Sequence, residues 1–276
     1  SNPNWEFEDY FLILSKRFDQ VYMFSADLMN LWKSHPKIVY FPTFFLTQLH
    51  DENHQTYDKS YRLSFLSNMP RFHRIYFYYK VKDVVTDDDC FRVTQLKEGL
   101  WRRDYVVDMK SVLGHYDNAV EKVLPFETHN SFVSNCKLGP HNEVMPNDIN
   151  TNAHIAYDSY FNVTAESILT AGKVFLTEKT WKAVRSAVIP VFLETNDIFN
   201  SFERLGFKFD NAVNIKAVSY LDKIEHIRKC MSELSMQDSK NIYSAELQYI
   251  KQNQAMFYDT KLLNIFRNHI RDKLAV

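Results

Sequence analysis

Glycine is scarce in this chain. Its 276 residues include only five, at Gly99, Gly114, Gly139, Gly172 and Gly206, and no two are close together. The GxGxxG loop of dinucleotide-binding enzymes and the GxxxxGK[ST] loop of P-loop NTPases both need closely spaced glycines to cradle a phosphate. Their absence excludes a glycine-fingerprint dehydrogenase and a P-loop NTPase.

Cysteines and long apolar runs are also few. The three cysteines, Cys90, Cys136 and Cys230, are odd in number and unclustered. This pattern predicts no disulfide framework and suggests a reducing compartment. No apolar run approaches the roughly 20 residues of a membrane span. The opening SNPNWEFEDYF lacks the basic region and apolar core of a signal peptide. We therefore expect a cytoplasmic protein that does not engage a membrane.

Aromatic residues, by contrast, are abundant, with 22 Phe and 16 Tyr. The chain is 45% hydrophobic and 24% charged, which is typical of a globular protein of one large or two moderate domains. The net charge of −1 does not exclude a nucleic-acid partner, because a local basic face can exist within a neutral total.

The most informative stretch is VFLTEKTWKAVRSAVIPVFLE, residues 174–194. Two apolar runs, Val174–Leu176 and Val188–Leu193, flank a charged helical segment. Thr177 is the expected N-cap of that helix, and Lys179 with the backbone N–H groups of the first turn forms an anion site. Strand, helix and strand in this order are typical of α/β proteins, which bind ligands where strands end.

Other segments continue this α/β pattern. We expect a short helix ended by Gly206, and two long helices between Ala217 and Val276. Further expected elements are a strand at Arg62–Leu66, a helix at Arg71–Val81 and a strand that ends near Glu166. Turn-forming residues at 129–152 indicate a boundary that divides the chain into domains 1–130 and 131–276.

Two charged groups have alternative interpretations. Arg71 and Arg74 share a helix face near its N-terminus, where cations oppose the helix dipole unless an anion binds; solvated arginines are the alternative. Asp87, Asp88 and Asp89 resemble the DxD triplet with which GT-A glycosyltransferases hold a metal on a nucleotide diphosphate. A solvated acidic loop is the alternative there.

Three segments together resemble the α-1,3-fucosyltransferase family. VFLTEKTWKAVRSAVIPVFL resembles its TEK triplet, helix and PVV-type strand, SYFNVTAES its FENS-type segment, and FVSNC its VSNC segment, in the same order. LSNMPRFHRIYFYYKV is similar to an LNRxPRxHR segment of uncharacterised proteins from bacteriophages and large DNA viruses. The chain thus looks like a virus-encoded relative of these glycosyltransferases.

The resemblance implies a GT-B architecture of two facing, Rossmann-like α/β domains with long C-terminal helices. The N-terminal half would receive the acceptor, and the C-terminal half would hold the nucleotide sugar without metal or other cofactor. Glu178 would bond the donor ribose and Lys179 would neutralise the diphosphate. The remaining donor-side candidates are Thr177, Glu166, Asn135, Arg71, Arg74 and His73. An inverting transfer needs a carboxylate base, for which Glu52 is the first candidate and Asp51 the second.

Two departures from the family limit what can be carried over. The arginine that follows VSNC in the family is replaced here by KLGPHN, and the glycine before the PVV strand by Ser186 and Ala187. A fucosyl donor is therefore not assumed; UDP-glucose is the donor we expect, with a GDP-sugar as the alternative.

The expected acceptor is a hydroxymethylated or already glucosylated base of phage or viral DNA, modified in the host cytoplasm. A basic and aromatic N-terminal face would bind double-stranded DNA. Its expected members include Arg62, Arg74, Lys80, Lys82, Lys97, Trp101, Arg102 and Arg103. A glycan or lipid-linked sugar as acceptor, the metal-dependent GT-A enzyme, and a non-catalytic nucleic-acid-binding protein are the alternatives. The oligomeric state is not predicted.

Overall fold

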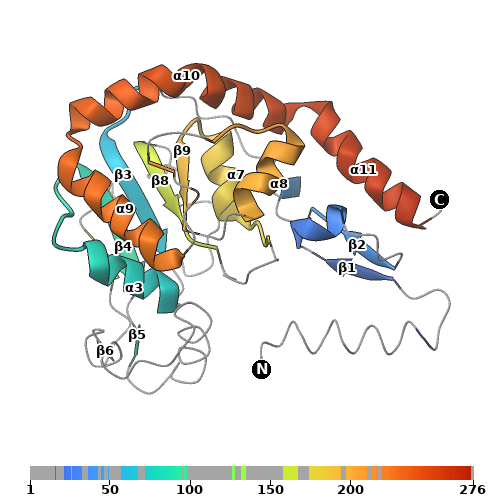
Figure 1. Ribbon diagram of the computed structural model, residues 1–276, viewed down its shortest axis with the longest axis horizontal. Coiled ribbons are helices and arrows are strands. Elements are labelled where there is room, and N and C mark those ends of the chain that lie inside the picture. Colours follow the sequence, from blue (N-terminus) through green and yellow to red (C-terminus); the bar gives the residue numbers. More distant parts are fainter. Residues whose placement is uncertain are drawn as a thin grey trace.

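A computed structural model provides the fold (Figure 1). It describes residues 16, 22–25, 27–32, 37–42, 45–46, 49, 57–67, 72–94, 96–97, 126–127, 132–134, 158–166, 174–193, 197–209, 213–214, 216 and 219–274. No helix among these residues is long and apolar enough to cross a membrane.

The centre of the molecule is a five-stranded sheet in the order β7-β4-β3-β8-β9. Four strands are parallel, and the edge strand β7 is antiparallel to β4. The strands are β3 (Tyr61–Ser67), β4 (Asp89–Thr94), β7 (Phe132–Ser134), β8 (Ser159–Thr164) and β9 (Ile189–Phe192). Most residues of β3, β8 and β9 are buried, as parallel strands covered on both faces require. The expected α/β class is confirmed.

Pro190 lies in β9, at an edge of the sheet. Proline lacks a backbone donor and is therefore tolerated only where a strand has one bonded side. The other side of β9 is covered by Asn214, whose amide group donates to Pro190 O and accepts from the N–H of Phe192 at 3.0 Å. The strand expected at Val188–Leu193 is confirmed, and its proline is explained by its position at the edge.

Two crossover units diverge from the middle of the sheet. The helix α3 (Phe72–Val81) leads from β3 to β4, and α7 (Glu178–Arg185) leads from β8 to β9. Because β3 and β8 are neighbours and their connections run in opposite directions, the boundary between them is a topological switch point. In α/β proteins, ligands bind outside the carboxyl ends of the strands at such a point.

The C-terminal region forms three helices, so the expectation of two long helices is wrong. They are α9 (Tyr220–Glu233), α10 (Met236–Tyr258) and α11 (Thr260–Leu274). Ser235 starts α10 through a capping box with Asp238, and the chain turns again at Asp259. Figure 1 shows α9 beside α3, α10 along one end of the sheet, and α11 reaching β1 and β2.

Small elements complete the described chain. The parallel pair β1 (Met23–Ser25) and β2 (Ile38–Tyr40) has the 3-10 helix η1 (Leu28–Leu31) between its strands, and β5 (Leu96–Lys97) pairs with β6 (Phe126–Glu127). The strand expected at Val174–Leu176 is absent: Phe175 makes one isolated bridge, to Asp27. Helix α8 (Asp197–Leu205) ends as expected at Gly206, whose φ is 94°.

The central sheet crosses the domain boundary expected at residue 130. Its strands β3 and β4 precede that residue, whereas β7, β8 and β9 follow it. The described parts of the two expected domains therefore share one sheet. The apolar core forms two clusters, one around α3 and α9 and one around α7, α8 and α11.

The structure describes two of the three cysteines. Cys90, on β4, is disulfide-bonded, whereas Cys230 on α9 is a free thiol. Cys136, the third cysteine, lies outside the described residues. One bonded cysteine is not a disulfide framework, and the reducing compartment and the cytoplasmic location both stay predictions.

Candidate functional site

The polar cluster that we examine as a site lies at the carboxyl end of β8, beside the switch point. It joins the residues after β8, the start of α7 and the first turn of α3. The sequence predicts most of its members, which the structure brings together: His73, Arg74, Glu166, Thr177 and Lys179.

Glu166 is the centre of this cluster and is completely buried. Its Oε1 accepts the N–H of Thr177 at 2.9 Å and the hydroxyl of Thr180 at 2.6 Å, and its Oε2 accepts the hydroxyl of Thr177. A carboxylate with this set of donors is well satisfied inside the protein. The expectation that Glu166 itself contacts the donor is not supported, because a fully buried side chain has no surface for a ligand.

Thr177 is the N-cap of α7, as predicted, and has an extended backbone conformation. Its hydroxyl accepts the N–H of Lys179 at 3.4 Å and the Nζ of Lys179 at 3.2 Å. The lysine side chain is half-buried and folds back over the first turn of its own helix. A positive charge is thus fixed at the positive end of α7, which is unfavourable unless an anion balances it.

The first turn of α3 reaches across the switch point to β8. His73 Nε2 is 2.8 Å from Glu166 O, and Arg74 Nε donates to Ala165 O at 3.0 Å. Both side chains are 2% exposed. The interpretation of Arg74 as a solvated arginine is wrong, because its guanidinium is buried against the end of a strand. The same burial also limits direct contact between Arg74 and a ligand.

The opposite end of α7 is fixed by three buried donors, one from the segment that precedes β3 and two from α10. Three consecutive carbonyl oxygens at the helix end each accept a hydrogen bond from a side chain. Gln254 donates to Arg185 O at 2.7 Å, Lys59 to Ser186 O at 3.3 Å, and Tyr243 to Ala187 O at 2.6 Å. Helix carbonyls in the last turn have no partner within the helix, so these donors replace water. Helix α7 is therefore held at both ends.

Lys59 carries its charge close to the C-terminus of α7. Burial lowers the pKa of the Lys59 ammonium to about 8, although the charge of Asp158 opposes the shift. A cation beside helix carbonyls is favoured by the helix dipole. Lys59 and Tyr243 lie in no sequence motif that predicts a site, and Thr180 is not one of the expected site residues. Only the T-x-x-T spacing of Thr177 and Thr180 gave a local signal.

Ala187, one of the two residues at the expected glycine position before β9, has a φ of 52°. A left-handed conformation costs a residue with a Cβ atom about 1–2 kcal/mol. The hydrogen bond from the Tyr243 hydroxyl to Ala187 O helps to hold this conformation.

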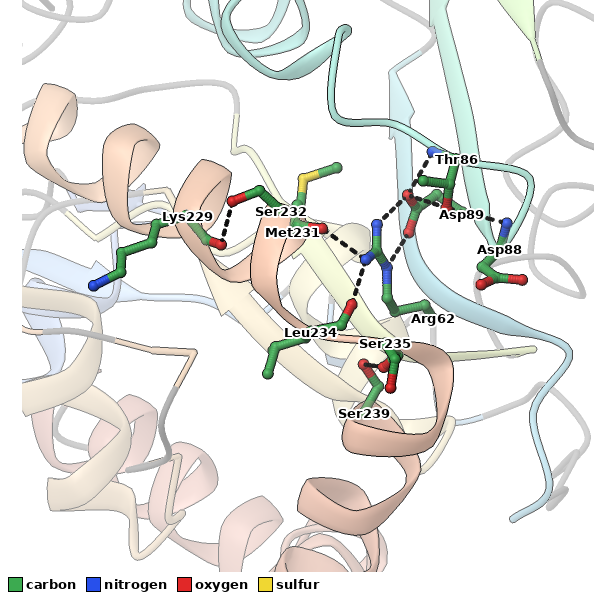
Figure 2. A network of polar contacts seen from close by, with 10 residues as sticks. All are labelled: Arg62, Thr86, Asp88, Asp89, Lys229, Met231, Ser232, Leu234, Ser235 and Ser239. Carbon is green, nitrogen blue, oxygen red and sulfur yellow. Dashed lines mark hydrogen bonds and ion pairs between the residues drawn. The ribbon is translucent and has the colours of Figure 1, made fainter.

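The acidic triplet does not form a metal site in the described chain. Asp89 is fully buried and pairs with Arg62, with Nε–Oδ1 and Nη2–Oδ2 distances of 2.9 and 2.6 Å (Figure 2). Arg62 Nη1 also donates to Met231 O at 2.7 Å and to Leu234 O. Asp89 is consequently a structural partner of Arg62. No group of three potential metal ligands occurs among the described residues.

The expected DNA-binding face is wrong at two of its members. Arg62 and Arg74 are buried and therefore cannot form part of a surface. Lys80 and Lys82, two described members of that face, lie near the C-terminal end of α3. His73 and Arg74 are at the other end of this helix, which is about 15 Å long because its ten residues each rise about 1.5 Å. The described cations therefore do not form one surface beside the site.

Several predicted residues lie outside the described part of the chain. These are Asp51, Glu52, Arg71, Trp101, Arg102, Arg103 and Asn135. Glu178 begins α7, but its side chain is likewise outside the described set. The catalytic base and the acceptor side consequently stay predictions.

Comparison with known proteins finds no matching family model, no matching curated protein and no matching solved structure.

Proposed function

We propose that this chain is a glycosyltransferase that holds the diphosphate of a nucleotide sugar at the start of α7. One observation carries the proposal: the ammonium of Lys179 is fixed over the N-cap of α7, beside the switch point of a parallel sheet. Helix N-termini and lysine ammonium groups are both suited to phosphate oxygens. The same charge would stabilise the diphosphate as it leaves during transfer.

A structural interpretation competes with this one. The carboxylate of Glu166 already supplies negative charge to the N-terminus of α7, so the helix needs no further anion for its own stability. That interpretation gives Lys179 no role in binding. The two interpretations differ in what Lys179→Ala does to ligand binding.

The finer parts of the proposal come from the sequence resemblance. They are a GT-B arrangement, UDP-glucose as donor, inversion with Glu52 or Asp51 as base, and a modified base of viral DNA as acceptor. Transfer to a base within a duplex would require the base to be flipped, or its modifying group to be reached through a groove.

A thermal-shift screen with UDP- and GDP-sugars tests the donor site. A ligand at 100 times its Kd adds about 2.7 kcal/mol of stability, which raises the Tm by roughly 5–10 °C. Lys179→Ala should abolish the shift. Lys182→Ala is the matched control, because it removes the same charge one turn further along α7 and should keep the shift. An equal shift in wild type and Lys179→Ala would refute the proposed site.

The acceptor is tested by mass spectrometry of DNA after incubation with enzyme and UDP-glucose. DNA with hydroxymethylated or glucosylated bases should gain the mass of a hexose, whereas unmodified DNA should not. Glu52→Gln should abolish transfer and leave the donor-induced thermal shift intact. Transfer to an oligosaccharide but to none of the DNA substrates would favour the glycan alternative. DNA binding without any response to nucleotide sugars would favour a non-catalytic protein.

A further inference from the structure

We infer that Glu166 is a positioning residue, which orients the ammonium of Lys179 through the hydroxyl of Thr177. The inference rests on the proposed function, because it concerns how the same site is prepared for a diphosphate. Glu166 is fully buried, so it acts only through the groups that it touches.

The proton arrangement at Thr177 supports this role. Its hydroxyl has one proton, which is donated to Glu166 Oε2, so its lone pairs face the two donors of Lys179. A carboxylate accepts only, and thereby sets the direction of this hydroxyl. Without this acceptor the hydroxyl could rotate, and its lone pairs would no longer be held toward Lys179. The orientation of Lys179 therefore depends on Glu166 accepting this proton.

Further contacts keep Glu166 in place. The Thr180 hydroxyl, one turn into α7, bonds its Oε1, and His73 bonds its backbone carbonyl from α3. The hydroxyl of Tyr220, on α9, donates in turn to His73 O. The cluster thus joins α9, α3, the end of β8 and the start of α7. Such supporting contacts lower the cost of ordering a side chain when a ligand binds.

Glu166 also balances charge within the site. Its carboxylate accepts the proton of the Thr177 hydroxyl, and the Lys179 ammonium donates to the oxygen of the same hydroxyl. The buried negative charge offsets the lysine charge while no ligand is bound. It also repels an incoming diphosphate, so the inference requires that the orientation of Lys179 outweighs this repulsion, and tighter diphosphate binding in Glu166→Gln would overturn it. The geometry therefore gives Glu166 an effect specific to phosphate, since the nucleoside part of a ligand carries no charge for Lys179 to bind.

The experiment measures the Kd of UDP and uridine, and of GDP and guanosine, by calorimetry. For whichever diphosphate binds the wild type, Glu166→Gln should raise the Kd about tenfold. The Kd of the corresponding nucleoside should change by no more than about twofold. Thr177→Val should have the same effect, and Thr177→Ser, which restores the hydroxyl, should return to wild type. The double variant Glu166→Gln/Thr177→Val should be no weaker than Thr177→Val, because both changes act through one hydroxyl.

The possible failures are distinguishable. Lys179→Ala could weaken the binding of UDP or GDP while Glu166→Gln and Thr177→Val leave that binding unchanged. This result would overturn the inference, and the proposed function would stand. Equal weakening of nucleoside and diphosphate, together with a lower Tm, would show that Glu166 only stabilises the fold. If wild type binds neither UDP nor GDP, the proposed function and this inference both fail. The two Thr177 variants decide the question if Glu166→Gln does not fold.

Discussion

The buried pair of Arg62 and Asp89 yields the sharpest stability prediction. Its side chains are 7% and 0% exposed, and Arg62 joins the first residues of β3 and β4 to the turn between α9 and α10 (Figure 2). In Arg62→Met, the carboxylate of Asp89 keeps its bonds from Thr86 but loses its counterion. Loss of one partner from a buried pair costs about 3–5 kcal/mol, a large part of a typical stability of about 5–15 kcal/mol.

Two further variants separate charge from shape. Asp89→Asn keeps the volume but leaves the buried guanidinium of Arg62 without its counterion, so we expect a comparable loss, about 3–5 kcal/mol. The double variant Arg62→Met/Asp89→Leu should be more stable than Arg62→Met, because no buried charge remains. Urea unfolding followed by circular dichroism measures each free energy of unfolding.

An exposed pair provides the control for this series. Lys216 and Glu203 have side chains that are 48% and 52% exposed, so Lys216→Ala should change stability by less than about 1 kcal/mol. A loss of less than about 1 kcal/mol in Arg62→Met would refute the reasoning. If Asp89 instead held a metal, EDTA would destabilise the wild type, and Asp89→Asn would remove that effect.

Three other substitutions test the two helix ends and the buried lysine. Because the pKa of Lys59 is about 8 in the folded protein and about 10.4 in the unfolded chain, the unfolded chain binds more protons between these values, and stability should rise there by roughly 2–3 kcal/mol. Lys59→Met should lack this rise when urea unfolding is compared at pH 7.5 and 10; an identical rise in both proteins would contradict the assignment. Ala187→Gly relieves a left-handed φ of 52° and should gain about 0.5–1 kcal/mol, seen as a higher Tm. Gly206→Ala should lose about 1–3 kcal/mol, because φ is 94° and the new Cβ would lie 2.7 Å from Met256 Cε; an unchanged Tm would contradict this.

Local signals in the sequence were sufficient for most described elements. Thr177 as an N-cap, Gly206 as a helix end and the strand around Pro190 all follow from residue types that act on their own backbone. The errors came from signals that compete. The apolar run at Val174–Leu176 resembles a strand, but only Phe175 forms a bridge. The break between α10 and α11 falls at Asp259, which lies within a continuous helical pattern and was therefore not predicted.

The sequence by itself determined the α/β class, the capped start of α7 and the candidate Lys179, because these depend on neighbours within a few residues. The tertiary structure alone decided which charges are available. Charged residues are usually exposed, but four of the candidates are buried against a strand, helix or turn distant in sequence. These are Arg62, Arg74, Asp89 and Glu166. Burial and pairing arise from contacts between residues as far apart as β3 and α10. No local pattern could therefore separate a half-buried lysine such as Lys179 from a fully buried carboxylate such as Glu166.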